Sequence, residues 1–373
     1  MATPCRFGNR RYSRFGNLRY AGVASRPPIG AFAEGELSKL ATCWILKSGK
    51  TKGVGERNMK RLQYDKYGGP EVVHLAEFTL PEPGDDEVVV QVAAASINPV
   101  DWKVRRGDLK LMTGSKFPRA MGGDFAGTVE SVGAKVSRFK PGDEVVGSVA
   151  MKACGAFAPK LVTSQKLVVK KPEKLSFEEA CTLPIAGVTA WCALVKEAHL
   201  ARGQKVFLNG AMGAVGQAAI AIAREIGAEV VGRVGPKSIA QAQAFGLAKV
   251  LDYTKPLPGE LNGAFDVVFD CNGSLTPQEE GRLKKKGGRI YDIAPTAWKF
   301  VRGLLSKSRK VVFCDPQAEN LQPVVDLAAA GKLVLPIVKT CSLEEAPALL
   351  ASLERGERLN GKAVITFPRT AGG

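Results

Sequence analysis

Three glycines spaced three residues apart carry the clearest chemical signature in this chain. They follow an apolar, strand-like run at 206–208 and open a segment of helical periodicity at about 215–226. Glycines at such a turn let the backbone approach a phosphate, and the free N–H groups of the helix start attract it. Strand, turn and helix in this order predict a dinucleotide site. The predicted cofactor contacts here are Gly210, Gly213, Ala214, Val215 and Gly216.

Charged residues after the next strand-like run, 229–231, indicate which dinucleotide binds. An NAD site usually places Asp or Glu about 20 residues beyond the glycines, against the ribose 2′-hydroxyl. This chain lacks a carboxylate there and has Arg233 and Lys237. Two cations suit a 2′-phosphate, so we predict NADPH and place Tyr253 in the same pocket. The alternative is that both cations merely solvate a loop.

The glycine turn belongs to a run of alternating strand-like and helical segments. Further strand-like runs lie at 249–251, 266–269 and 289–293, and a second helical segment lies at 238–245. This alternation predicts an α/β fold with a doubly wound parallel sheet that is covered by helices on both faces. Asn272 follows one such strand and Phe313 follows a later strand-like run. Ligands contact such positions, so both residues are predicted to border the cofactor.

The preceding part of the chain is rich in β-strand patterns. Short runs at 88–92, 127–132 and 144–149 are separated by turn signals, and a helix over 176–193 opens with Ser176 as N-cap. The last strand-like run, 362–367, has the same composition, so we expect the chain to return to this unit. The predicted domains are 59–184, completed by 332–368, and 185–331.

The 373 residues carry a net charge of +17, and 45% of them are hydrophobic. This is the composition of a globular protein, and no apolar run reaches membrane-spanning length. Residues 1–58 hold eleven Lys and Arg against three Glu, with no acidic residue before Glu34. We interpret them as an organellar transit peptide, for a plastid rather than a mitochondrion. The alternative is that they are a disordered basic arm or result from a mistaken gene start, in which case we expect a cytoplasmic protein.

The eight cysteines show no metal-binding or redox spacing. No two are closer than eleven residues, and the chain has only two histidines, His74 and His199. Buried, reduced thiols are therefore expected, and a structural metal or redox pair is not.

Seven ordered motifs resemble the zinc-independent quinone oxidoreductase and alkenal/enone reductase branch of the medium-chain dehydrogenase/reductase superfamily. They lie at 96–101, 122–127, 138–145, 183–190, 213–216, 286–290 and 331–333. The resemblance implies a GroES-like β-domain joined to a Rossmann domain, with the active site in the cleft. It also implies that Asn98 lies on the nicotinamide and substrate side of that cleft, and that Thr189 approaches the cofactor.

Two departures from the zinc-dependent relatives shape the expected chemistry. Asn98 and Gly123 stand where those enzymes have a zinc-ligating Cys and His, so no zinc is expected and alcohol oxidation loses its Lewis acid. The resemblance therefore implies NADPH-dependent hydride transfer to the C=C bond of an α,β-unsaturated carbonyl, or to a quinone.

This chemistry also needs a proton donor. Lys103 stands where many relatives have Tyr, and we predict that it hydrogen-bonds the substrate carbonyl and donates the proton. The alternative is a surface lysine beside Arg105 and Arg106. Asp101 and Asp124 are expected to brace loops.

The remaining predictions concern partners. A small electrophilic carbonyl or quinone and a second copy of the chain, in a homodimer, are expected. Residues 296–310 mix cations with Trp298 and Phe300, which favours an anionic membrane or a substrate entrance; a packed helix or a subunit contact is the alternative. An enoyl-thioester reductase is a second candidate function. An RNA-binding or structural role is a third, and it finds support only in that same segment.

Overall fold

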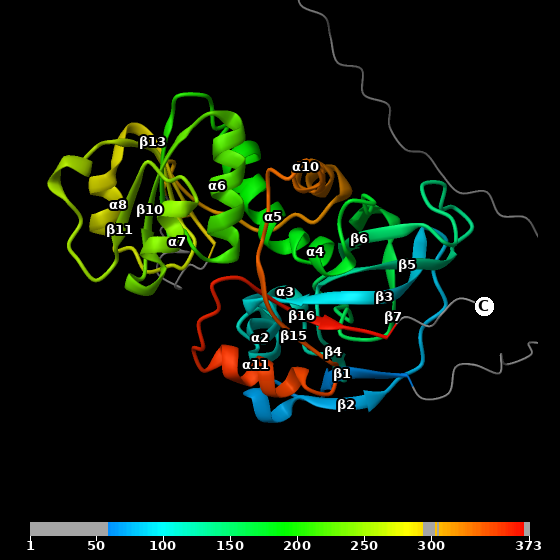
Figure 1. Cartoon of the computed structure of the whole chain (residues 1–373). Helices are drawn as coiled ribbons and strands as arrows, with labels where there is room; N and C mark the ends of the chain where they lie inside the picture. The colour runs from blue at the N-terminus through cyan, green and yellow to red at the C-terminus, as the bar shows by residue number, and fades with distance from the viewer. Residues whose placement is uncertain (1–58, 294–302, 304–305, 369–373) are drawn as a thin grey trace, which may run out of the picture. The chain divides into compact units, whose positions relative to one another are not determined.

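The computed structural model describes residues 59–293, 303 and 306–368 (Figure 1). Its larger β-sheet has seven strands, of which β7 pairs with β3 beside the main path. The order along that path is β15 (Ile337–Cys341), β16 (Lys362–Thr366), β3 (Glu87–Ile97), β5 (Asp124–Val132), β6 (Glu144–Ser148) and β8 (Val168–Lys170), with β7 spanning Lys160–Ser164. The return of the chain to its first unit is confirmed, because β16 pairs antiparallel with β3.

A smaller sheet of three strands lies beside this one. Its order is β2 (His74–Glu77), β1 (Lys60–Tyr64) and β4 (Arg119–Ala120). Leu62 of β1 donates to the carbonyl of Phe157 and accepts from the N–H of Met121. The two sheets share one apolar core, which includes Leu62, Phe125 and Ile365.

The second large sheet has six parallel strands. Its order is β11 (Lys249–Asp252), β10 (Glu229–Val234), β9 (Lys205–Asn209), β12 (Phe265–Asp270), β13 (Lys284–Asp292) and β14 (Arg309–Val311). The strand order reverses between β9 and β12, so the crevice at their carboxyl ends is where such folds bind ligands.

Helices bury both faces of the parallel sheet, as the alternating pattern predicts. Val206 and Leu208 of β9 face a core that includes residues of α5 (Leu183–Trp191), α6 (Ala214–Ile226), α7 (Ile239–Ala244) and α10 (Ala318–Ala329). Phe207, between them, faces a second core with Leu283 of α8 (Pro277–Leu283). Successive side chains of a strand point to opposite faces, so one run of residues serves both cores.

The structure differs from the sequence prediction at several helices, of which two concern the core of the parallel sheet. The helix expected over 176–193 is divided into α4 (Phe177–Cys181) and α5, and Ser176 caps α4 as predicted. The divide comes at Thr182, directly before Leu183-Pro184, because Pro184 has no N–H to continue the backbone hydrogen bonds of α4 and is suited to the first turn of a new helix. Helix α10 was not anticipated, and Pro323 lies inside it.

Several predictions fall on residues outside this description. The transit segment 1–58 lies there, as does most of the basic segment 296–310. Among the described residues, no helix is long and apolar enough to cross a membrane. The six described cysteines are free thiols, of which Cys181, Cys192 and Cys341 are buried.

Candidate active site

The glycine turn has the geometry that a dinucleotide requires. Gly210 follows β9 with a φ of +79°, which favours glycine, and Gly213 caps α6. A Cβ on Gly216 would lie 2.5 Å from the carbonyl oxygens of Gly210 and Ala211, so only glycine fits there. The first N–H groups of α6 therefore lie against the turn, where the dipole of the helix favours a pyrophosphate.

A hydrogen-bonded network fixes this turn from the neighbouring strand. Asn209, the last residue of β9, donates to Asp270 Oδ1 at the end of β12 and to Asn272 Oδ1, each at 2.7 Å. Asp270 also accepts from the N–H groups of Gly273 and Leu275. The predicted residue Asn272 thus packs beside Gly210, at the switch point between β9 and β12.

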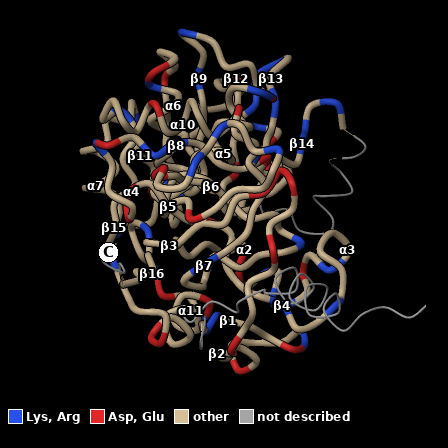
Figure 2. The backbone as a smooth tube through the Cα atoms, turned by 90° about the vertical axis from the view of Figure 1, so that its right-hand side faces the viewer, with Lys and Arg blue, Asp and Glu red and all other residues tan. Residues whose placement is uncertain are grey.

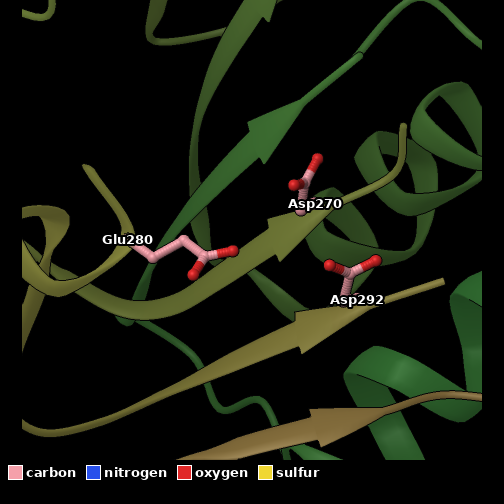
Figure 3. Close-up of side chains that lie close together, drawn as sticks. All are labelled: Asp270, Glu280 and Asp292. Carbon is pink, nitrogen blue, oxygen red and sulfur yellow. The ribbon is translucent and has the colours of Figure 1, made fainter. Parts of the chain in front are cut away.

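Asp270 belongs to a fully buried group of three carboxylates with Glu280 and Asp292, which Figure 3 shows converging from neighbouring segments. Arg309 of β14 forms an ion pair with Glu280 and lies 3.9 Å from Asp292. This internal cation gives the cluster a structural role: it ties α8, β13 and β14 together under the crevice.

The residues predicted to read the cofactor's ribose lie at the carboxyl ends of β10 and β11. Lys237 is exposed. Arg233 is 9% exposed; its guanidinium pairs with Glu279 at 3.2 Å and donates to the carbonyl of Tyr253 at 3.2 Å. Tyr253 is 57% exposed. Of the two predicted cations, only Lys237 is thus available to a ligand without breaking an ion pair.

Phe313 and Thr189 complete the predicted cofactor set. Phe313 follows β14 and is 51% exposed. Thr189 is buried in α5, where its hydroxyl donates to the carbonyl of Ile185 at 2.6 Å and lies beside the Cys314 thiol. The tertiary structure therefore brings the predicted cofactor residues to one edge of the parallel sheet.

An apolar cavity of about 380 Å³ lies within the β-rich part of the chain and reaches the segment after β14. Such a volume is within the range of small-molecule sites. The β-rich wall includes Tyr64, Asp101 and Ser148, while Ile185, Cys314 and Pro316 form the wall next to the parallel sheet. A substrate in this cavity lies beside the segment that borders the predicted cofactor crevice.

Asn98 sits at the centre of a buried polar network beside this cavity. Its Oδ1 accepts from Lys362 Nζ at 2.6 Å, and its Nδ2 donates to Asp124 Oδ2 at 3.0 Å. Asp124 also accepts from Ser148 Oγ and from the N–H of Ile185, both at 3.0 Å. Burial lowers the pKa of Lys362 and raises that of Asp124 to about 6, while their mutual attraction opposes both shifts. Lys362, from the last strand, was missed by the sequence analysis.

Helix α2 (Pro99–Arg106) carries two titratable residues named in the sequence analysis, Asp101 and Lys103, and only Asp101 lines the cavity. Asp101 lines the cavity, and its Oδ2 accepts from the N–H of Asn98 at 2.7 Å. Burial, with the nearby charge of Asp124, raises the pKa of Asp101 to about 7. Lys103 is half-buried and is not among the residues that line the cavity. Asp101 therefore braces its loop, as expected, and also presents a carboxyl group to the site.

Comparison with known proteins decides the family. Residues 84–205 match the alcohol dehydrogenase GroES-like domain, and residues 245–365 match the zinc-binding dehydrogenase family. The chain is 34% identical over 292 residues to the chloroplast envelope quinone oxidoreductase homolog of Arabidopsis thaliana, covering 74% of this chain and 88% of that protein. It belongs to the quinone oxidoreductase and alkenal reductase branch of the medium-chain dehydrogenases/reductases.

Two further relatives support this assignment of the chain to the oxidoreductase family. It is 33% identical to the chloroplastic NADPH-dependent alkenal/one oxidoreductase of A. thaliana, over 72% of each protein. The quinone oxidoreductase of Coxiella burnetii has a TM-score of 0.74 and 28% identity, covering 84% of this chain and all of that one. The predicted fold, a GroES-like β-domain with a Rossmann domain, is confirmed, and membership of this family carries a nicotinamide cofactor.

Proposed function

We propose that this oxidoreductase transfers hydride from NADPH to the C=C bond of α,β-unsaturated carbonyls or to quinones, without zinc. The observation that carries the proposal is the apolar cavity that extends to the segment after β14, at the carboxyl edge of the parallel sheet that also carries the glycine turn. NADPH supplies the hydride; the protein orients the acceptor, excludes water and supplies a proton. Incubating the pure protein with NADPH or NADH against quinones, short alkenals and long enones, and following nicotinamide oxidation, tests it. No turnover with any acceptor would reject it.

Zinc independence rests on the donor set beside the cavity. Asn98 and Gly123 occupy the positions of two zinc ligands of the relatives that use the metal. Both polar atoms of the Asn98 amide are already bonded, and one of the partners is the buried cation Lys362. A divalent cation at this position would meet the Lys362 ammonium group, and the neighbouring carboxyl group of Asp124 already accepts from Asn98, Ser148 and Ile185.

The choice of NADPH rests on the exposed cation Lys237. Substitution by alanine should raise the KM for NADPH about tenfold, the worth of one charge-assisted hydrogen bond, and leave the KM for NADH unchanged. Steady-state kinetics with both cofactors measure this. Arg233→Ala provides the comparison: because Arg233 pairs with Glu279 in a largely buried position, its loss should also lower the melting temperature. Equal effects of Lys237→Ala on both cofactors would contradict the assignment.

Asp101 is the proton donor that the geometry favours over Lys103. Its carboxyl lines the cavity, and at a pKa of about 7 part of the population is protonated at neutral pH. The charges that face it are Asp124, which raises this pKa, and Lys362, which lowers it. Because the protonated form donates, kcat for an enone should fall as the pH rises through about 7.

A pair of variants on one helix tests this. Asp101→Asn keeps an oxygen that accepts from the Asn98 N–H, yet should lower kcat on the order of a hundredfold and abolish the dependence on pH near neutrality. Lys103→Met should leave both unchanged. A large loss in Lys103→Met with normal turnover in Asp101→Asn would return the role to Lys103.

An enoyl-thioester reductase is the second candidate, because the CurK enoyl reductase has a TM-score of 0.72 and 26% identity over all of its chain. A crotonyl thioester included among the acceptors distinguishes the two. An RNA-binding role has less support, because Lys and Arg are interspersed with Asp and Glu along the backbone that Figure 2 shows.

Plastid location, a homodimer and membrane contact through 296–310 remain part of the proposal. The chloroplastic relatives support the location. Import into isolated chloroplasts, light scattering of the pure protein, and vesicle flotation with and without that segment test the three in turn.

A further inference from the structure

The hydroxyl of Tyr64 is a buried donor without an acceptor in the wall of the cavity. Tyr64 ends β1 and is 1% exposed, and no described residue accepts the proton of its Oη, because the nearby Arg119 guanidinium can only donate. A buried hydroxyl left unpaired costs free energy, so native proteins rarely retain one without a reason. The cavity that Tyr64 lines offers the reason: a ligand with an acceptor atom.

The neighbours of Tyr64 do not supply that acceptor. Arg119, opposite it on β4, donates to three carbonyl groups, those of Thr113, Gly114 and Lys152. Phe117 packs edge-on against the Tyr64 ring, with 5.9 Å between the centroids. Burial raises the pKa of Tyr64 to about 12, although Arg119 opposes the rise, so the hydroxyl keeps its proton at neutral pH. It can therefore donate to an uncharged oxygen.

The position of Tyr64 sets which oxygen it meets. Tyr64 belongs to the three-stranded sheet, whereas Cys314 and Pro316 line the same cavity from the segment that follows β14 of the parallel sheet. Ile185 of α5 also lines the cavity, and in the view of Figure 1 α5 lies above β3 and β16 while β1 lies below them. A ring reduced beside the parallel sheet therefore points its far side toward Tyr64.

We propose that Tyr64 is a specificity-determining residue that donates a hydrogen bond to a second oxygen of the substrate, across the ring from the reacting carbonyl. The preferred substrates are then para-quinones and six-membered cyclic ene-diones. In the ene-dione, hydride adds to one alkene carbon and a proton to the other, while NADPH becomes NADP+ and the far oxygen stays bonded to Tyr64. This inference rests on the proposed reductase function.

Two matched substrates and two matched variants test it. Ketoisophorone is an ene-dione with its oxygens in para positions, and 2,6,6-trimethylcyclohex-2-enone is the same ring without the second oxygen. Tyr64→Phe should lower kcat/KM for ketoisophorone about tenfold and leave that for the mono-enone unchanged. Tyr67→Phe is the control, because the Tyr67 hydroxyl already donates to the carbonyl of Gly114 and Tyr67 does not line the cavity. It should leave the ratio of the two substrates unchanged.

The melting temperature and a binding measurement separate this inference from the proposed function. Tyr64→Phe removes a hydroxyl that has no acceptor, so its melting temperature should equal or exceed that of the wild type. Calorimetry should show that hydroquinone binds more tightly than phenol to the wild type and that Tyr64→Phe removes the difference, even if no acceptor is reduced. Equal losses on both ring substrates, or an unchanged preference for ketoisophorone and hydroquinone, would overturn the role of Tyr64.

Discussion

Replacement of Lys362 by methionine should lower the free energy of unfolding by about 1–3 kcal/mol, the cost of leaving a buried hydrogen-bond acceptor without its donor. Lys362 is 3% exposed, and its ammonium group donates to Asn98 Oδ1 and to the carbonyl of Ile97. Methionine fills a similar volume but leaves the Asn98 oxygen without its donor and Asp124 without its cation. Denaturant unfolding of the pure protein measures the loss.

The loss should depend on pH in a defined direction. Burial raises the pKa of Asp124 to about 6 from its ordinary value of 3.8, and Lys362 opposes the rise. The folded carboxyl thus holds its proton more tightly than the unfolded one, so its contribution to stability falls as the pH rises between these values. Without Lys362 this fall extends to higher pH, and the deficit of the variant should be larger at about pH 7 than at about pH 5.

Two control variants test whether the loss of stability comes from the buried network of Lys362. Lys339 lies on the neighbouring strand β15 opposite Ala363 and is exposed, so Lys339→Met should change stability little. Asp124→Asn added to Lys362→Met removes the unpaired charge and should recover part of the loss. Equal destabilisation by Lys339→Met and Lys362→Met would contradict the role of the buried network.

Valine at Gly216 should weaken NADPH binding at least about a hundredfold, because displacing a positioned group by about 1 Å can cost that much. A Cβ there would already lie 2.5 Å from two backbone carbonyl oxygens of the glycine turn. Helix α6 must therefore move away from the turn, and its N-terminal N–H groups move with it. Fluorescence or calorimetric titration with NADPH measures the affinity.

Gly281 provides the matched control. It lies in α8, and a Cβ on it would meet nothing within 4 Å. Gly281→Ala should leave NADPH affinity unchanged, and alanine should favour the helix slightly. If Gly216→Val bound NADPH normally while its fold was intact, the turn would not be the pyrophosphate site.

Local patterns were enough to predict the parallel sheet and its glycine turn. The strand-like run that holds Val206 and Leu208 and the glycines that follow it lie within about ten residues of one another. Their spacing alone therefore predicts a strand, a turn and a helix in that order. Arg233 and Lys237 were predicted at the end of a strand because they directly follow another strand-like run. The sequence could not show that the Arg233 guanidinium is already paired, because its partner Glu279 lies in α8, 46 residues later.

Helix phase supports our proposal of Asp101, rather than Lys103, as the proton donor. Asp101 and Lys103 are two residues apart, and a helix turns about 200° over that distance, so they cannot share one face. The sequence analysis named Lys103 as the donor and expected Asp101 to brace a loop, because it could not state which face of α2 lines the cavity. The contacts of Val100, Asp101 and Val104 with the cavity settle the phase.

The sequence by itself determined the fold class, the family and the position of the glycine turn, because each depends on residues close together in the chain. Only the tertiary structure joined Lys362 to Asn98 across 264 residues, left the Tyr64 hydroxyl without an acceptor in a cavity wall, and engaged Arg233 with Glu279. Burial and pairing depend on which distant strands meet, and these contacts set the charge and hydrogen-bonding capacity of each side chain in the site.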